Sequence, residues 1–527
     1  MTNVPPLWSG VNVFGADQAI VDRLVGTEPI PKVLTSLGAL AGSAEAAEWA
    51  RQANTFPPTL RTHDRYGRRV DEVDFHPAWH ELMTVAVEHG LHAAPWASDS
   101  PSAHLTRAVG FFVWSQVEAG HGCPISMTYS AVPALRHTPD LAAQFEPLLC
   151  APYYDFGLRA PASKAGLLAG MAMTEKQGGS DVRANTTRAV PGGDTYVLTG
   201  HKWFCSAPMS DLFLVLAQAP GGLSCFLVPR VLPDGNRNAF SVQRLKDKLG
   251  NRSNASSEVE FDGTVGWLVG DEGHGVPTIL DMVTMTRLDC IIGSAATQRA
   301  ALTQAMHHTR HRSAFGAPLI RQPLMRRVLA DLALESEAAI ALFMRLAEAV
   351  DAGESDLLRL GVAAGKYWVC KRTPTVVGEA LECLGGNGYV EDSGMPRMFR
   401  ESPLNSIWEG SGNVICLDVL RALRRDPGSV AALFAELDLS MGADARLDEA
   451  IADLRRQVAA QPSEQAARRI AGCIARCLQA ALLVRTAPAA VADGFVATRI
   501  AVEPSAVAGE SAVDVDVDAI LERAEVA

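Results

Sequence analysis

One carboxylate, Glu409, lies in the segment NSIWEGSGN (405–413), between an aromatic residue and three small ones. Such a group can do acid–base chemistry, because burial beside the ring of Trp408 disfavours its ionised form and raises its affinity for a proton. The alternative is purely structural: Glu409 would cap a helix or pair with an arginine such as Arg400 or Arg421. The segment by itself leaves both interpretations open.

A second segment, MAMTEKQGGSDV (171–182), combines hydroxyl groups with glycines. Thr174 and Ser180 can donate hydrogen bonds, while Gly178 and Gly179 allow backbone amides to approach a ligand closely. A capped turn with no ligand would have the same composition. The pattern therefore indicates a binding loop or an ordinary turn.

A flat aromatic residue, Trp203, stands in HKWFCSAP (201–208), followed by the polar Ser206 near the expected end of a strand. This pair suits a planar ring that needs both a cover and a hydrogen-bond donor. Taken alone, a tryptophan in a strand is more often a core residue.

Two further segments could approach a nucleotide. RSAFGAPLIRQ (312–322) brings together a cation, Arg312, an aromatic ring, Phe315, and a tight turn, which suit a pyrophosphate and an adenine. ECLGGNGYVED (382–392) is a glycine-rich stretch that allows another close backbone approach.

The elements that must position these residues change character along the chain, which predicts an α+β fold. Residues 1–165 have the helical period, and residues 166–283 consist of short β-branched or aromatic runs between turns such as PGGD and LPDGNRN. The helical period returns in residues 284–438, with one long apolar stripe from 323 to 351. Residues 439–527 predict an extra helical domain whose acidic end we expect to be mobile.

Composition and length limit the classes of protein. The chain has 527 residues, of which 48% are hydrophobic and 20% charged, as in ordinary globular proteins. No window approaches 18 uninterrupted apolar residues, and the start MTNVPPLWSG lacks the features of a signal peptide. We therefore expect a cytoplasmic protein that does not associate with a membrane.

Metal and common nucleotide motifs are not recognisable. The ten cysteines form no CxxC pair and predict buried, reduced thiols. His307 and His311 could share a helix face, but no nearby cysteine or carboxylate completes a metal site, so we expect none. GVAAGK (361–366) has three residues between its glycines where a phosphate loop needs four, and no GxGxxG follows a strand.

Charge is unevenly distributed. The formal net charge is −12, which argues against a chain built uniformly for nucleic acid. The tail from Ala501 to Ala527 holds seven acids and one base, whereas residues 421–500 hold eleven arginines, nine acids and no lysine. Arginine suits phosphate, but the intervening acids favour a solvated helix face of mixed charge equally well.

The five segments occur in one chain in a fixed order, and together they resemble the acyl-CoA dehydrogenase family of flavoproteins. TEKQGGSD resembles the flavin-contacting loop of that family, KWFCS its tryptophan-centred strand and RSAFG its pyrophosphate-contacting turn. LGGNGY resembles its glycine segment and WEGSGN its catalytic segment. RLKDKLGNRSNAS and SPLNSIWEGSGNVICLDVLR are similar to the AidB-like adaptive-response subgroup, which carries an extra C-terminal helical domain. The similarity runs from about residue 76 to about residue 425.

The resemblance implies FAD as the cofactor, an acyl-CoA as the substrate, and an N-terminal helical domain, a middle β-barrel-like domain and a C-terminal helical bundle. It makes Glu409 the base that removes the α-proton while the β-hydrogen leaves as hydride. One branch of the family has its base on an earlier helix, where this chain has Thr286, which cannot do that work at neutral pH. The residues implied to contact FAD are Met173, Thr174, Gly179, Ser180, Trp203, Ser206, Arg312, Phe315, Gly385, Gly386, Ser411 and Asn413. The residues implied to contact the substrate are Ser180 and Gly410.

Two departures from the family pattern bear on the cofactor. The strand usually reads Trp-Ile-Thr, and here Cys205 or Ser206 must replace the threonine hydroxyl. After the base, the family usually has Thr and then Glu or Gln, where this chain has the shorter Ser411 and Asn413.

The resemblance carries two functions of different classes, and in both cases implies a homotetramer. The first is dehydrogenation of short or branched, isovaleryl-like acyl-CoA. The second is binding of double-stranded DNA in the response to alkylation damage, by a flavoprotein whose dehydrogenase machinery is vestigial. An acyl-CoA oxidase is a third option. The arginines expected to contact DNA are Arg421, Arg424, Arg455, Arg456, Arg468 and Arg469.

Overall fold

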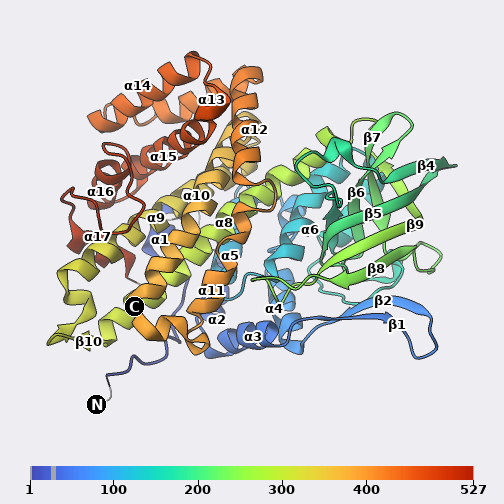
Figure 1. Ribbon diagram of the computed structural model, residues 1–527, viewed down its shortest axis with the longest axis horizontal. Helices are drawn as coiled ribbons and strands as arrows, with labels where there is room; N and C mark the ends of the chain where they lie inside the picture. The colour runs from blue at the N-terminus through green and yellow to red at the C-terminus, as the bar shows by residue number, and fades with distance from the viewer. Residues whose placement is uncertain (1–2, 25–30, 526–527) are drawn as a thin grey trace. The chain divides into compact units, whose positions relative to one another are not determined.

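The computed structural model describes residues 3–24 and 31–525, and the chain divides into two compact units (Figure 1). Unit 1 comprises residues 1–47, 104–117 and 287–527. Unit 2 comprises residues 48–103 and 118–286. Within the described ranges, none of the helices combines the length and the apolar character that crossing a bilayer requires.

Unit 2 is built around a β-barrel, as the short β-branched runs of the sequence predict. Five strands form a closed ring in the order β6, β4, β5, β9 and β7, because β7 also pairs with β6; β3 and β8 extend it by pairing with β6 and β9. The strands are β3 (Ala169–Ala172), β4 (Arg188–Gly192), β5 (Thr195–Ser206), β6 (Leu212–Ala219), β7 (Gly222–Pro229), β8 (Phe240–Leu245) and β9 (Ser256–Val269).

The barrel interior is apolar and closely packed. Phe213, Phe226, Phe240 and Phe261 pack there with the aliphatic side chains of the same strands, each at most 2% exposed. Strand β6 is buried at six successive positions, which explains why its sequence LFLVLA is apolar without alternation. A rigid barrel follows, whose strand ends can hold side chains in fixed positions.

Helices complete unit 2. Helix α4 begins with Pro77 at its first position, and the ring of His76 accepts a hydrogen bond from the Ala78 amide at 3.2 Å, which caps the helix. The helices of this unit are α4 (Pro77–Glu88), α6 (Gly122–Leu135) and α7 (Pro139–Leu149), with the larger part of α3 (Ala44–Thr55).

The N-terminal region, predicted as helical, also contains two strands. The polar stretch near residue 65 is the turn of an antiparallel hairpin between β1 (Thr59–His63) and β2 (Arg69–Asp74). The hairpin forms because Val73 is buried at 1% exposure, and the Arg69 guanidinium donates to the Val242 carbonyl oxygen at 2.9 Å. Polar residues make up most of these strands, so no apolar run marks them in the sequence.

Unit 1 is a bundle of helices. The stripe predicted from 323 to 351 is α9 (Pro323–Asp351), a single helix with 17 buried residues. The remaining helices are α1 (Gln18–Leu24), α2 (Lys32–Ala41), α5 (Ala103–Ser115), most of α8 (Gly275–His311), α10 (Ser355–Cys383), α11 (Met395–Glu401), α12 (Gly412–Arg425), α13 (Pro427–Asp438), α14 (Ala445–Ala459), α15 (Ala467–Thr486), α16 (Ala489–Arg499) and α17 (Val517–Ala524). A short hairpin, β10 (Ser313–Ala314) with β11 (Ala317–Pro318), joins α8 to α9.

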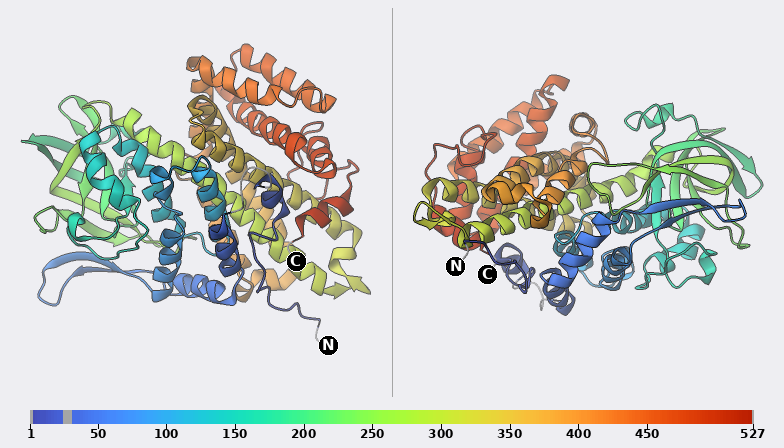
Figure 2. Two further views of the ribbon diagram at one scale, coloured as in Figure 1. Left: turned by 180° about the vertical axis from the view of Figure 1, so that it is seen from behind. Right: turned by 60° about the horizontal axis from the view of Figure 1, so that its bottom comes forward.

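The expectation of a mobile acidic end is wrong for the described residues up to 525. Helix α17 packs beside α9 (Figure 2), and its residues Ile520 and Leu521 are buried according to their exposed areas. Arg299 donates to the Ala524 carbonyl oxygen at 3.0 Å, and the Arg523 guanidinium contacts Glu337 at 3.2 Å. Apolar residues spaced for one helix face, together with this hydrogen bond and this ion pair, outweigh the repulsion between the acids.

Candidate functional site

The loop from Met173 to Ser180 and the strand residue Trp203 lie against each other in unit 2. The pairing of β5 with β9 is irregular between Lys202 and Cys205, so the Trp203 amide does not follow the ladder. It donates instead to the Thr174 carbonyl oxygen at 2.8 Å. The structure thus brings together two segments that the sequence analysis assigned to one ligand.

Glycine is required in this loop for two different reasons. Gly178 has φ +130°, a conformation that side chains with a Cβ rarely adopt. A Cβ on Gly179 would collide with the Thr174 hydroxyl. Ser180 follows, and its side chain is exposed. The Gly178 amide donates to the Glu175 carbonyl oxygen at 3.0 Å, whereas residues 179–180 are exposed.

A buried ion pair holds the loop to the barrel. The Lys202 ammonium group donates to Glu175 at 2.9 Å and to the Leu216 carbonyl oxygen at 2.7 Å, and both side chains are fully buried. The other oxygen of Glu175 accepts from the Thr186 amide at 2.6 Å. Loop, strand and the segment before β4 are therefore joined at one point.

The ionisation of this pair follows from its surroundings. Burial would raise the pKa of Glu175, but the charge of Lys202 and the amide of Thr186 outweigh it and lower the pKa to about 2. Burial lowers the pKa of Lys202 to about 8, although Glu175 acts in the opposite direction. Both groups are consequently charged at neutral pH.

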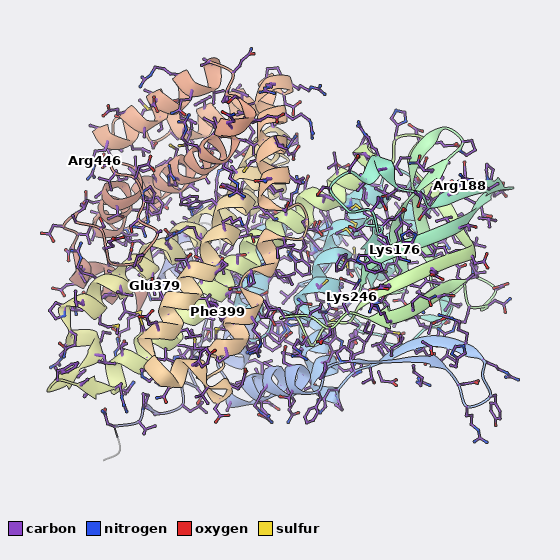
Figure 3. All side chains as sticks on the ribbon, in the orientation of Figure 1. Lys176, Arg188, Lys246, Glu379, Phe399 and Arg446 are labelled. Atoms are coloured by element: carbon purple, nitrogen blue, oxygen red, sulfur yellow. The ribbon has the colours of Figure 1, made fainter. Side chains whose placement is uncertain are left out.

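Trp203 is half-buried, so it is not the core residue that the alternative interpretation required. Three cations surround its ring: the ammonium group of Lys246 lies 3.4 Å from the ring centroid, that of Lys176 5.7 Å, and the guanidinium of Arg244 5.9 Å. Figure 3 labels Lys176 and Lys246 on the same part of unit 2. An aromatic surface with cations at its border suits a planar ligand that carries negative charge.

The two candidates for the missing threonine hydroxyl have different environments. Cys205 belongs to the barrel core and is fully buried, and burial raises the pKa of its thiol to about 12. Ser206 is half-buried, and its hydroxyl lies 3.2 Å from that of Ser256. Ser206 is the one of the two whose side chain is partly accessible.

In unit 1, Glu409 lies in a turn between a short 3-10 helix and α12. Its φ of 58° is in the left-handed region, which is uncommon for a residue with a side chain, and Gly410 follows with φ 106°. A Cβ on Gly410 would lie 2.9 Å from the Ile415 side chain. Glu409 and Trp408 are both half-buried rather than buried. The backbone at 409–410 is therefore held in a conformation that is unfavourable in free energy for these residues.

Two cations hold three successive carbonyl groups of this turn. The Lys366 ammonium group, on α10, donates to the Trp408 carbonyl oxygen at 2.8 Å and to that of Gly410. The Arg287 guanidinium, on α8, donates to the Glu409 carbonyl oxygen at 3.0 Å. The conformation of the turn is thus fixed from the side of its carbonyl oxygens.

Further contacts fix these cations and the tryptophan. Asp418 on α12 accepts from Arg287 at 3.0 Å and from Arg359 at 2.8 Å. The Trp408 indole donates to the Asn405 side chain at 2.8 Å, and Asn405 donates to the Cys290 carbonyl oxygen at 3.3 Å. The turn is therefore connected to α8, α10 and α12.

The structural interpretation of Glu409 named two arginines, and each contacts another carboxylate. Arg400 pairs with Glu391, and Arg421 lies 3.4 Å from Asp418. At the alternative position for a base, the Thr286 hydroxyl donates to the Val283 carbonyl oxygen at 3.1 Å. The two arginines therefore have other carboxylate partners, and the role of Glu409 stays a prediction.

The remaining predicted cofactor residues of unit 1 lie on different elements. Arg312 precedes the β10–β11 hairpin and contacts the Asn3 carbonyl oxygen, while Phe315 at the hairpin tip is 98% exposed. Gly385 and Gly386 form an exposed turn at the end of α10. Figure 1 shows β10 and α12 at opposite ends of the unit. Within this chain, Arg312 and Phe315 are not brought to the Glu409 turn.

The six arginines expected to contact DNA are exposed, and they divide by partner. Three contact carboxylates: Arg421 with Asp418, Arg455 with Asp438 and Arg456 with Asp453. Three contact neutral oxygens: Arg424 with the Pro462 carbonyl, Arg468 with Asn413 at 2.8 Å, and Arg469 with Gln457. Arg468 on α15 thus contacts a residue that the sequence analysis assigned to the cofactor.

Other chemically capable residues have structural roles. His307 contacts the Pro6 carbonyl oxygen at 2.8 Å, and His311 contacts the carbonyl of His307 at 2.9 Å. The ten cysteines are free thiols, and nine of them are buried. These residues carry no part of the site.

The residues that hold the two segments, Lys202 with Glu175 and Lys366 with Arg287, were not predicted from the sequence. A lysine within the otherwise apolar helical run GVAAGKYWV was the available signal for Lys366, because a buried lysine needs partners. Glu175 lies in the motif at 171–182 and Lys202 in the motif at 201–208, but no pattern in the sequence pairs them.

Comparison with known proteins matches three segments to families. Residues 3–156 match the N-terminal domain of the adaptive response protein AidB. Residues 170–264 and 273–424 match the middle and C-terminal domains of acyl-CoA dehydrogenases. The predicted α+β fold is confirmed: N-terminal helical region, middle β-barrel and C-terminal helices, with extra helices to residue 524.

Whole-length relatives agree with these matches. AidB of Escherichia coli (strain K12), which is named only provisionally as an acyl-CoA dehydrogenase, is 48% identical over 480 residues, 89% of this chain and 88% of AidB. Acyl-CoA dehydrogenase family member 11 of Caenorhabditis elegans is 31% identical over 430 residues, 77% of this chain and 69% of that protein. The crystal structure of Caenorhabditis elegans ACDH-11 in complex with C11-CoA is similar with a TM-score of 0.86 and 27% identity, over 96% of this chain and 94% of that one. This chain belongs to the acyl-CoA dehydrogenase family.

Proposed function

We propose that this protein is an FAD-dependent acyl-CoA dehydrogenase that acts on short or branched acyl groups, with Glu409 as its base. The observation that carries the proposal is the turn at Glu409, where Lys366 and Arg287 hold the carbonyl oxygens of residues 408–410. Strained residues held by dedicated contacts are a common feature of active sites. The family relationship and the C11-CoA bound by ACDH-11 support an acyl-CoA as the ligand.

The residues of unit 2 fit FAD. The loop is exposed at 179–180, and its backbone amides there can approach a ligand closely because residue 179 carries no side chain. Trp203 offers a half-accessible ring bordered by Lys176, Arg244 and Lys246. A flat flavin and a charged pyrophosphate need these two properties. Of the two residues that could replace the family's threonine, we assign the hydroxyl role to Ser206, because Cys205 lies in the barrel core.

The chain's own residues then have defined tasks. The Glu409 carboxylate takes the proton from Cα of the acyl thioester, and the C–H electron pair at Cα becomes part of the new Cα–Cβ double bond. Bound FAD supplies the acceptor for the hydride that leaves Cβ, so that an enoyl-CoA results. Gly410 keeps the backbone narrow beside the thioester, where an amide can stabilise the developing enolate.

A homo-oligomer follows from the same proposal. Phe315 is 98% exposed at the tip of a hairpin, an unusual position for a phenylalanine. The β10–β11 hairpin, which Arg312 precedes and whose tip is Phe315, lies at a different end of the unit from α12 (Figure 1). We infer that these two residues serve the cofactor of a second copy, as in a homotetramer.

The test is anaerobic bleaching of the flavin by a panel of acyl-CoAs from isovaleryl to C11. The wild-type protein should bleach with at least one of them. Glu409→Gln should slow bleaching by about 10²- to 10⁴-fold, the usual contribution of a general base, while FAD stays bound. Wild-type protein that binds no FAD, or a Glu409→Gln variant that bleaches at the wild-type rate, would refute the proposal.

DNA binding is a second candidate, supported by the exposed Arg424, Arg468 and Arg469, which contact neutral oxygens rather than carboxylates. Such guanidinium groups remain available to phosphates. A flavoprotein with vestigial dehydrogenase machinery would then fail to bleach with any acyl-CoA. Its duplex affinity would fall steeply with salt, because phosphate contacts release counterions.

A further inference from the structure

Lys366 is a buried cation whose acceptors are main-chain carbonyl groups. It lies in the middle of α10 at 1% exposure and donates to the carbonyl oxygens on both sides of Glu409. Within the described residues, no carboxylate lies within ion-pair distance of its ammonium group. Keeping an uncompensated charge in the interior costs stability, so a plain packing role would be better filled by an apolar side chain.

Holding a carbonyl oxygen also directs the amide on the other side of the same peptide. In a trans peptide the C=O and N–H bonds point in opposite directions. The oxygens of Trp408 and Gly410 point to Lys366, so the N–H groups of Glu409 and Ser411 point away from it. The oxygen of Glu409 points to Arg287, so the N–H of Gly410 points away from that guanidinium.

The charge adds a second effect to this orientation. A cation that bonds to a carbonyl oxygen polarises the whole peptide group and makes its N–H a stronger donor. Lys366 bonds to two such groups. Burial raises the pKa of the Cys290 thiol well above its ordinary value, the charge of Lys366 acts to lower that pKa, and Glu409 acts to raise it.

We propose that Lys366 is a positioning residue for the acyl thioester: by holding and polarising the peptide groups on both sides of Glu409, it turns their N–H groups toward the thioester carbonyl oxygen. This inference rests on the proposed function. Developing negative charge on that oxygen is stabilised by donors that are fixed before the reaction begins. Lys366 itself touches neither substrate nor cofactor in this scheme.

Three variants separate the roles of Lys366. Lys366→Met keeps the length and removes both donor and charge, while Lys366→Gln keeps N–H donors without the charge. Lys32→Met removes an equal charge from the exposed surface of α2 in the same unit and serves as the control. Hydrogen exchange of residues 404–416 should become faster in Lys366→Met, change less in Lys366→Gln, and stay at the wild-type rate in Lys32→Met.

The ligand measurement uses an acyl-CoA and its thioether analogue, which lacks the carbonyl oxygen. Lys366→Met should bind the thioester about tenfold more weakly and bleach about 10- to 100-fold more slowly at saturation. Its affinity for the thioether should remain as in the wild type. A purely structural role would weaken both ligands equally.

The outcomes are distinguishable from failure of the proposed function. If the wild type bleaches with no acyl-CoA, that function fails, and hydrogen exchange still decides whether Lys366 fixes the turn. Unchanged exchange at 404–416, or equal losses for thioester and thioether, overturns the inference. If Lys366→Met does not fold, Lys366→Gln decides by the same two measurements.

Discussion

The loop beside Trp203 and the turn at Glu409 are held in place by different kinds of contact. In unit 2, Glu175 and Lys202 pair with each other inside the protein, and the loop rests on this pair. In unit 1, Lys366 and Arg287 contact backbone oxygens of a strained turn. The first arrangement belongs to the fold itself, whereas the second constrains a few peptide groups. A substitution in the Glu175–Lys202 pair should therefore lower the free energy of unfolding, and a substitution at the Glu409 turn should lower activity.

The largest effect on stability is expected from Glu175→Gln. The change leaves Lys202 as an unpaired buried cation, which typically costs about 3–5 kcal/mol. Unfolding by urea, followed by tryptophan fluorescence, should give a lower midpoint, and FAD affinity should fall with it. The double variant Glu175→Gln/Lys202→Met should recover part of the loss. A loss below about 1 kcal/mol would contradict the role of the pair.

The same variant has a pH signature. The pKa of Glu175 is about 2 in the folded protein and about 4.5 in an unperturbed glutamate. Its contribution to stability is therefore fully present above pH 4.5 and is lost as the pH falls toward 2. The difference in unfolding free energy between wild type and Glu175→Gln should narrow over this range. A difference that stays constant between pH 5 and pH 3 would show that the carboxylate charge is not what stabilises the loop.

Gly410→Ala tests the other side of the comparison and should have a smaller effect on stability. The φ of 106° and the close Ile415 side chain make alanine unfavourable by about 1–3 kcal/mol. The turn should shift, and flavin bleaching should slow by about 10- to 100-fold, since 1.4 kcal/mol corresponds to a factor of ten.

Gly353→Ala is the matched control for this variant. Gly353 has φ 68° with no other atom near its Cβ position, so the alanine pays a backbone cost alone. It should lower the unfolding midpoint slightly and leave bleaching unchanged. Equal bleaching by Gly410→Ala and wild type would mean that the geometry of the turn does not limit the reaction.

The order of elements was predictable because it depends on local signals, whereas the two candidate site segments stay predictions. The apolar period from 323 to 351 predicted α9 with its bounds, and short β-branched runs predicted the barrel. The sequence shows which residues neighbour a predicted site residue along the chain. It does not show which side chain fixes the site residue in place when that contact joins segments far apart in the sequence.

Three findings illustrate this limit. Lys366 acts on carbonyl oxygens, which every residue has, so nothing in segment 405–413 marks it as the partner. The irregular pairing at Trp203 depends on the Thr174 carbonyl, 29 positions away. Helix α17 is stabilised by Arg299, more than 200 residues earlier in the chain. Tertiary contacts of this kind override the local preference for a mobile acidic end.

The smallest expected effect concerns the cations around Trp203. Lys246 and Arg244 both pair with Glu258 at 2.7 Å, but Lys246 lies 3.4 Å from the ring centroid and Arg244 5.9 Å. A cation over an aromatic face contributes about 0.5–1 kcal/mol at a partly exposed site, and the contribution falls with distance. Lys246→Met should therefore weaken FAD binding by about two- to fivefold. Arg244→Met should weaken it less, although each variant loses one ion pair with Glu258. If the two variants bind FAD equally well, the charge near Glu258 matters and the contact with the ring does not, and the ring of Trp203 would then be positioned by its backbone bond to Thr174 alone.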